Sequence, residues 1–128
     1  MGWRGFAVSG LILGLVNGCS STVAELRSSP PLDSVKLRGD YKKIMECSTA
    51  QMTGPNVTPL YFDQERRATL TFVTQGDFNR TRGVLEIVLQ QISNDVVQYE
   101  LRVGQGVYHA NAAGIRKPIA DCSQGVVG

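Results

Sequence analysis

The sequence is poor in the residue types that most metal sites and catalytic centres use. Histidine occurs once and cysteine three times in 128 residues, which excludes most metal-ligand sets and nucleophile–base pairs. An excess of charge of either sign is missing as well, because 13 basic residues stand against 11 acidic ones. That balance gives no general electrostatic case for binding nucleic acid. We therefore expect no metal, no cofactor and no nucleic-acid partner.

Signs of a repeat, a disordered tail or a membrane span are also missing. Fourteen glycines and five prolines are too few and too scattered for a repeat or a disordered tail. An apolar run from Gly5 to Val16 is short of the roughly 20 residues that span a bilayer. It follows Arg4, an arrangement typical of a secretory signal. The length of the chain supports one domain.

The residues after this run indicate the kind of signal. Val16-Asn17-Gly18-Cys19 resembles the lipobox of bacterial lipoprotein precursors, although Asn17 stands where alanine or serine is commoner. The resemblance implies a signal peptide over residues 1–18, cleavage between Gly18 and Cys19, and acylation of Cys19 as a membrane anchor. Serine rather than aspartate after the cysteine implies the outer membrane, with the domain facing the periplasm. The alternatives are an ordinary secretory signal or a cytosolic chain with an apolar start.

The other two cysteines are predicted to form a disulfide. Setting Cys19 aside for lipid leaves Cys47 and Cys122, an even pair in a chain exported to an oxidising compartment. The bond would close a loop that contains nearly the whole folded domain. A domain this small gains stability from such a crosslink, which restricts the unfolded chain. Two free thiols are the alternative, whereas a zinc site would lack further ligands.

The mature chain is predicted to begin with a tether and to continue with a helix. Residues 19–38 comprise the lipidated cysteine and a flexible, serine-rich tether with a Pro30-Pro31 pair. Residues 39–128 form a single domain, in which Asp40 is the N-cap of a helix that Gly54-Pro55 ends. The apolar stripe of this helix has helical spacing and consists of Tyr41, Ile44, Met45, Ser48 and Met52.

Alternation with a period of two predicts three antiparallel strands, at 68–74, 84–91 and 96–103. The turn Ser93-Asn94-Asp95 sets the register of the last two. On the buried face this register pairs Leu89 with Tyr99, Ile87 with Leu101 and Leu85 with Val103. On the outer face it places Glu86 opposite Arg102, an opposite-charge pair across the strands.

The remaining segments complete the predicted fold. Tyr61-Phe62 is a candidate short edge strand, and residues 115–122 return as a helix or as an extended segment. The fold class is therefore α+β, with one α-helix packed on a three- to four-stranded antiparallel meander and one disulfide.

Catalytic groups with a recognisable spacing are not found. Nothing in the spacing of His109, Asp121 and Ser123 implies the hydrogen bonds of a catalytic triad. Glu86 and Glu100 are expected to be solvated residues on the outer face of the sheet, not a pair of catalytic carboxylates. We therefore expect that the protein is not an enzyme.

The segment Gly76–Gly83 is the candidate binding loop. It is long for a hairpin connection, and it brings Phe78 together with Arg80 and Arg82. An aromatic ring with two guanidinium groups suits stacking on a sugar or clamping a carboxylate or phosphate. The alternative is that Phe78 tucks under the loop and the arginines only add solubility.

As a layout, the chain resembles small proteobacterial envelope lipoproteins, which share a lipobox, a helix bearing a cysteine, an antiparallel sheet and a cysteine near the C-terminus. We expect a non-enzymatic binding or accessory module, held to the membrane by its lipid, for an envelope protein complex or for peptidoglycan. The alternative is a periplasmic inhibitor or ligand-binding protein, for example against lysozyme-type hydrolases. The Ser-Gly-containing loop characteristic of lysozyme inhibitors is not evident in this sequence.

Overall fold

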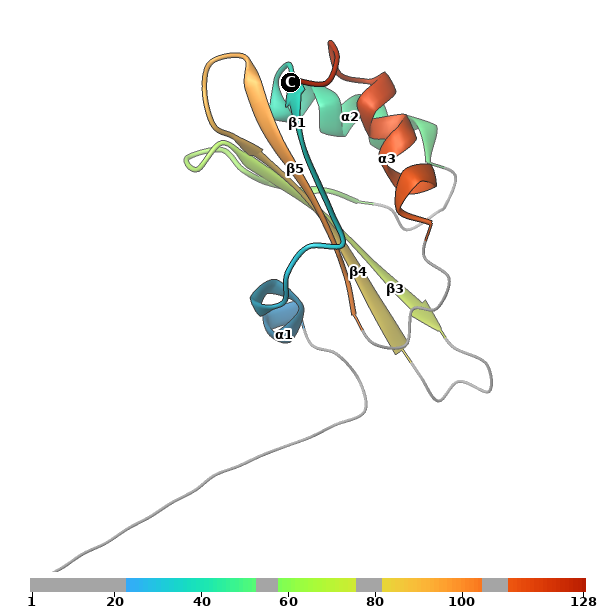
Figure 1. The fold of residues 1–128 in the computed structure, drawn as a ribbon. Coiled ribbons are helices and arrows are strands. Elements are labelled where there is room, and N and C mark those ends of the chain that lie inside the picture. Colours follow the sequence, from blue (N-terminus) through green and yellow to red (C-terminus); the bar gives the residue numbers. More distant parts are fainter. Residues whose placement is uncertain (1–22, 53–57, 76–81, 105–110) are drawn as a thin grey trace, which may run out of the picture.

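The computed structural model describes residues 23–52, 58–75, 82–104 and 111–128, whose arrangement is shown in Figure 1. In chain order the elements are α1 (Val23–Ser28), β1 (Asp33–Arg38), α2 (Tyr41–Gln51), β2 (Leu60–Phe62), β3 (Arg67–Gln75), β4 (Arg82–Gln91), β5 (Val96–Val103) and α3 (Ala112–Asp121). They form an α+β fold in which α2 and α3 cover one face of a sheet and α1 lies on the other. We call these the inner and the outer face.

The sheet is antiparallel and its strands follow the order β1-β5-β4-β3-β2. The meander of β3, β4 and β5 confirms the three predicted strands, and β2 is the expected short edge strand. The prediction of three to four strands is nevertheless wrong, because β1 pairs with β5 at the opposite edge. Residues near the C-terminus then cover β1, since Arg38 N donates to Gly125 O and Val127 N donates to Lys36 O, both at 2.8 Å.

The flexible tether predicted for residues 19–38 is wrong for residues 23–38, which form α1 and β1. Leu26 in α1 is 3% exposed, and Leu37 in β1 is fully buried in the core on the inner face. Serine and proline dominate the composition of this segment, so its two buried leucines are hard to recognise in the sequence. In the structure, burial alternates along residues 33–38, as it does in a strand. The folded domain therefore includes Val23, which lies sixteen positions before residue 39, the predicted start of the domain.

Helix α2 forms as its sequence predicts. The Asp40 carboxylate caps it by accepting hydrogen bonds from Lys42 N and Lys43 N, at 3.0 and 3.1 Å. The residues of the predicted stripe that lie within the helix are all buried: Tyr41, Ile44, Met45 and Ser48. The Ser48 hydroxyl donates to Ile44 O at 2.6 Å, which satisfies this polar group inside the core.

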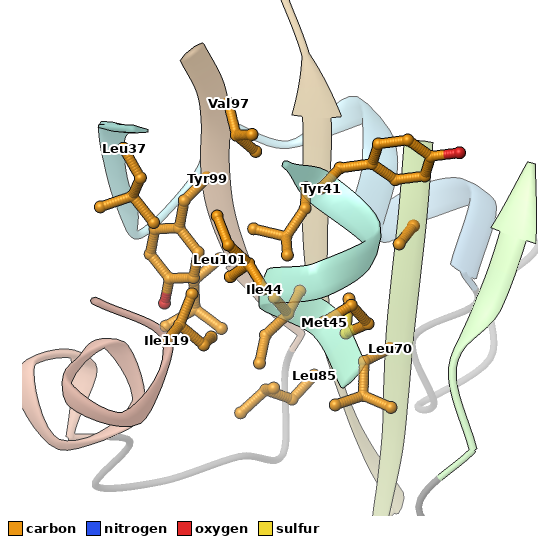
Figure 2. Close-up of a cluster of buried hydrophobic side chains, with 13 residues drawn as sticks. Leu37, Tyr41, Ile44, Met45, Leu70, Leu85, Val97, Tyr99, Leu101 and Ile119 are labelled. Carbon is orange, nitrogen blue, oxygen red and sulfur yellow. The ribbon is translucent and has the colours of Figure 1, made fainter. Parts of the chain in front are cut away.

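The hairpin of β4 and β5 has the predicted register. Leu89 pairs with Tyr99, Ile87 with Leu101, and Leu85 with Val103. These side chains meet α2 and α3 in the core shown in Figure 2, where Tyr99, Ile87, Leu89 and Leu101 have no exposed surface. Apolar burial on one face of the sheet therefore provides the main driving force for folding.

The C-terminal segment resolves as a helix, so the prediction of a single helix is wrong: α1 and α3 accompany α2. The Asn111 side chain caps α3 by accepting the amide of Gly114 at 3.0 Å. The predicted disulfide is confirmed, with the Cα atoms of Cys47 and Cys122 5.8 Å apart. It joins α2 to the residue that follows α3, and so fixes both helices on the inner face.

Candidate functional site

Several residues singled out in the sequence lie outside the described part of the chain. They are the anchor and cleavage residues, two members of the candidate binding loop and the histidine, namely Gly18, Cys19, Phe78, Arg80 and His109. Arg82 is the first residue of β4, where it pairs with Gln75 of β3. The two strands therefore extend further than the alternation predicts, and the connection between them is 76–81.

The acidic residues singled out in the sequence have structural partners. Glu86 is fully buried, which corrects the prediction of a solvated residue, and its carboxylate binds Arg27 of α1 at 3.0 Å. Glu100 binds Arg102, also at 3.0 Å. Asp121 binds Lys117 on the same helix at 2.8 Å. The first contact attaches α1 to β4, whereas the other two lie within β5 and within α3, and none of them forms a pair of catalytic carboxylates.

Among the described residues, the concave feature best suited to a ligand lies on the inner face, between the sheet and the two helices that cover it. It is a cavity of about 380 Å³, within the roughly 300–1,000 Å³ of small-molecule sites. We call it the α3 pocket; its walls are Met52, Phe72, Leu85, Ile87, Gly114, Ile115 and Pro118. Neither a charged side chain nor a side chain that forms hydrogen bonds is among them.

Two residues of α3 limit how far this helix fills the space. Gly114 has no side chain, and a Cβ atom there would lie 3.1 Å from Nδ2 of Asn111, the residue that caps the helix. Glycine therefore protects the cap while leaving the pocket wall without a side chain at this point. Pro118, inside the helix, presents a compact ring to the same wall.

This pocket is not predictable from the pattern of the sequence, although that pattern places Met52, Leu85 and Ile87 on buried faces. A cavity depends on how a helix docks, which periodicity does not reveal. The available signal is a glycine and a proline inside one ten-residue helix. Both residues disfavour a helix interior, so their presence there points to a packing or binding role.

The described walls of the α3 pocket suit an apolar group. A ligand atom that forms hydrogen bonds would lose its water there without gaining a partner from the walls. A hydrocarbon chain or an aromatic ring would instead gain the free energy of apolar burial. The pocket therefore selects against charged and strongly polar groups.

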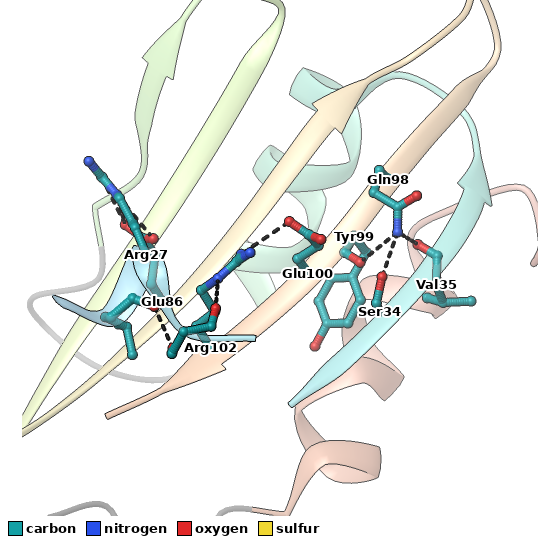
Figure 3. A network of polar contacts seen from close by, with 10 residues as sticks. Arg27, Ser34, Val35, Glu86, Gln98, Tyr99, Glu100 and Arg102 are labelled. Carbon is teal, nitrogen blue, oxygen red and sulfur yellow. Dashed lines mark hydrogen bonds and ion pairs between the residues drawn. The ribbon is translucent and has the colours of Figure 1, made fainter. Parts of the chain in front are cut away.

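A second cavity, of about 230 Å³, lies on the outer face beside α1. Its walls include three basic side chains, Arg27, Arg67 and Arg102, around the Glu86 carboxylate. Figure 3 shows the contacts of Arg27 and Arg102. The hydrogen bonds to Glu86 are the main cause that raises the pKa of the Arg27 guanidinium, and the negative charge of Glu86 raises it further. Because these arginines already contact Glu86, Glu65 and Glu100, the cavity is a weaker candidate for a free anion.

A buried polar group lies where β1, β5 and α3 meet. Tyr99 Oη and Asp33 Oδ2 are buried and form no hydrogen bond with any described residue. The Asp33 oxygen lies 3.4 Å from Nε of Arg116 on α3. Burial is the main cause that raises the pKa of Tyr99, and the charge of Asp33 raises it further. The ion pair holds α3 to β1, while the tyrosine contributes its ring to the core.

Two further kinds of feature are absent from the part of the chain that the structure describes. Among residues 23–52, 58–75, 82–104 and 111–128, no group of three or more His, Cys, Asp or Glu side chains is placed to hold a metal ion. Within the same ranges, no helix combines the length and the apolar character needed to cross a membrane. Comparison with protein-family models, with curated proteins and with solved structures finds no match for this chain.

Proposed function

We propose that this chain is a lipid-anchored binding protein of the bacterial envelope, whose domain receives an apolar group of its ligand in the α3 pocket. Acylated Cys19 would hold it to the outer membrane with the domain facing the periplasm. The observation that carries the binding role is the α3 pocket, of about 380 Å³, whose described walls are all apolar. The protein acts by binding and is not an enzyme.

The pocket favours the ligand-binding hypothesis over the two other partners considered from the sequence. Peptidoglycan presents sugars and charged peptides, which the apolar walls would leave without hydrogen bonds. An envelope protein complex fits only if it inserts an apolar side chain. The hydrocarbon part of an amphipathic molecule, with its polar end left in water, matches the walls best.

Two features support export and anchoring. The sequence Val16-Asn17-Gly18-Cys19 follows an apolar run in the manner of a lipobox. The Cys47–Cys122 disulfide suits an oxidising compartment such as the periplasm. Two or three acyl chains on one cysteine anchor a protein stably, whereas one chain does so only marginally.

The binding role is tested with an uncharged fluorescent probe, N-phenyl-1-naphthylamine, whose emission rises in apolar surroundings. The mature chain from residue 19, with Cys19→Ser to prevent acylation, contains every described residue. We expect saturable binding at one site. Ile115→Trp fills the pocket and should weaken binding about tenfold or more, a loss of about 1.4 kcal/mol.

The matched control is Ala113→Trp, which adds the same ring at an exposed position of α3. It should change the affinity by less than about twofold. Far-ultraviolet circular dichroism and the thermal midpoint establish that both variants fold. If the probe binds both variants equally, or binds the parent chain without saturation, the pocket is not the binding site.

The anchor is tested separately by Cys19→Ala in the full-length precursor, with Ser20→Ala as the control. Labelled palmitate should enter the parent and the control but not Cys19→Ala. Cys19→Ala should also be lost from the outer-membrane fraction. Unchanged labelling and fractionation of Cys19→Ala would disprove the lipid anchor and leave the binding role standing.

A further inference from the structure

We propose that the outer face of the sheet, at the end where α1 packs, lies directly against the head groups of the bilayer. The inference rests on the proposed anchor at Cys19 and adds an orientation to it. A long tether would leave the domain free to turn, so the orientation depends on where the folded chain begins.

The folded chain begins very close to the anchor. Only residues 20–22 separate Cys19 from Val23, the first residue of α1. Four Cα–Cα steps at roughly 3.3–3.6 Å per residue reach no further than about 14 Å. Val23 is therefore held within about half a bilayer core thickness of the lipidated cysteine.

Helix α1 is fixed to one face of the sheet. The short connection between Cys19 and α1 therefore holds that face close to the bilayer. Leu26 is 3% exposed, and Arg27 binds Glu86 of the central strand β4 at 3.0 Å. Immediately after the helix, the carbonyl oxygen of Ser29 accepts a hydrogen bond from Nε of Arg102 in β5 at 3.0 Å. Among the described elements, α1 is the one nearest to Cys19 in the sequence, and it lies on the outer face, opposite α2 and α3 (Figure 1).

The charge of the outer face suits anionic head groups. The strand registers place Lys36, Arg38, Arg67 and Arg102 on this face together with Glu86 and Glu100, and Arg27 of α1 joins them. Glu65 and Asp95 in the adjoining turns pair with Arg67 and Arg38, so the five basic side chains exceed these four carboxylates by one. Each basic residue close to an anionic bilayer surface contributes about 1 kcal/mol of attraction. The Arg27–Glu86 pair uses Nε and Nη2 of the guanidinium, and a guanidinium carries further N–H donors on Nη1.

The orientation also places the α3 pocket. Because α3 covers the inner face, the pocket opens on the side of the sheet away from α1. A bilayer against the outer face therefore leaves the pocket accessible from the periplasm. The outer face of the sheet then contacts the bilayer, while the inner face carries the ligand pocket.

The experiment uses the acylated protein in vesicles and a single introduced tryptophan. The only natural tryptophan is Trp3, within the predicted signal peptide, so the mature chain has none. Thr71→Trp places the reporter on the outer face opposite Glu86, at an exposed position. Ala113→Trp places it on α3, on the other side of the sheet. Lipids with a nitroxide on the head group quench nearby tryptophans.

We expect the nitroxide lipid to quench Thr71→Trp at least about twofold more than Ala113→Trp, because tethering at 14 Å or less holds the outer face at the surface. Ten glycine and serine residues inserted after Ser20 lengthen the connection and should remove most of that difference. Vesicles without anionic lipid should reduce it. Circular dichroism checks that each variant folds.

The outcomes separate this inference from the anchor. If the protein does not float with the vesicles, the anchor has failed. If it floats but both reporters are quenched equally, or Ala113→Trp more strongly, the anchor stands and the orientation is wrong. A Thr71→Trp reporter shielded in native envelopes but unquenched in vesicles would assign this face to a protein partner, which also overturns the proposal.

Discussion

Arg27 and Glu86 lie 59 positions apart in the sequence, yet their side chains form an ion pair at 3.0 Å that joins α1 to the central strand of the sheet. The Glu86 side chain is fully buried, and that of Arg27 is 55% exposed. A buried carboxylate is costly unless a cation and hydrogen bonds compensate for its lost hydration. The pair therefore explains why a helix of six residues stays on the outer face.

Removing Arg27 should destabilise the domain. Arg27→Ala leaves the Glu86 carboxylate uncompensated, and we expect a loss of about 2 kcal/mol in the free energy of unfolding. This is less than the roughly 3–5 kcal/mol of a fully buried pair, because Arg27 is half exposed. Urea denaturation of the parent and variant measures the difference.

The matched control is Arg38→Ala, which removes an arginine from a solvent-exposed contact with Asp95 at 3.5 Å. Exposed pairs contribute little, so this variant should differ from the parent by less than about 0.5 kcal/mol. Equal losses in the two variants would mean that Arg27 does no more than an ordinary surface arginine.

The same pair shows what the sequence could and could not predict. The register of β4 and β5 follows from alternation and one turn, so Glu86 was correctly placed opposite Arg102. The partner of Glu86 was not predicted, because α1 belongs to a serine-rich segment with little apolar surface. Contacts between distant segments leave no local periodicity in the sequence.

The candidate site shows a similar limit. Periodicity identified the apolar side chains of α2, β3 and β4, and the cysteine count identified the Cys47–Cys122 bond. The α3 pocket depends on the docking of a helix that the sequence left open between helical and extended conformations. Gly114 and Pro118 were not singled out from the sequence, and a glycine and a proline do not by themselves specify a cavity.

Loss of the disulfide should be the most destabilising change that leaves the core side chains intact. Cys47 and Cys122 are separated by 75 positions, so the bond restricts most of the unfolded chain. In the chain-entropy description this contributes about 4 kcal/mol. Urea denaturation of Cys47→Ser/Cys122→Ser, compared with the oxidised parent, measures it. Two alkylatable thiols at these positions in the protein isolated from the envelope would contradict the bond itself.

The hydroxyl of Tyr99 should contribute little to stability. Its side chain is fully buried, but Oη forms no hydrogen bond with the residues that the structure describes. Tyr99→Phe should therefore change the free energy of unfolding by less than about 0.5 kcal/mol, or increase it, since no bonded hydroxyl is lost. Tyr99→Ala, which removes the ring, should cost about 3–5 kcal/mol. A loss of about 2 kcal/mol or more in Tyr99→Phe would reveal a buried partner for the hydroxyl.

The contact between Tyr41 and Asp63 should make stability depend on pH at both extremes. Tyr41 Oη donates to Asp63 Oδ1 at 2.7 Å. This hydrogen bond is the main cause that raises the pKa of Tyr41 from 10.0 to about 12 and lowers the pKa of Asp63 below 3.8. The tyrosine contribution is complete below pH 10.0 and is lost as the pH rises towards 12. The aspartate contribution is complete above pH 3.8 and is lost as the pH falls through the lowered pKa.

Asp63→Asn should therefore destabilise the domain most between these limits, and the difference from the parent should shrink outside them. The ultraviolet absorbance of tyrosinate gives a direct readout, because one tyrosine should titrate nearer its ordinary pKa of 10.0 in the variant than in the parent. Asp95→Asn removes a carboxylate that binds Arg38 and should leave the titration unchanged. If the tyrosinate titrations of the parent and Asp63→Asn coincide, the hydrogen bond does not hold the Tyr41 proton in solution, and the proposed cause of the pH dependence is wrong.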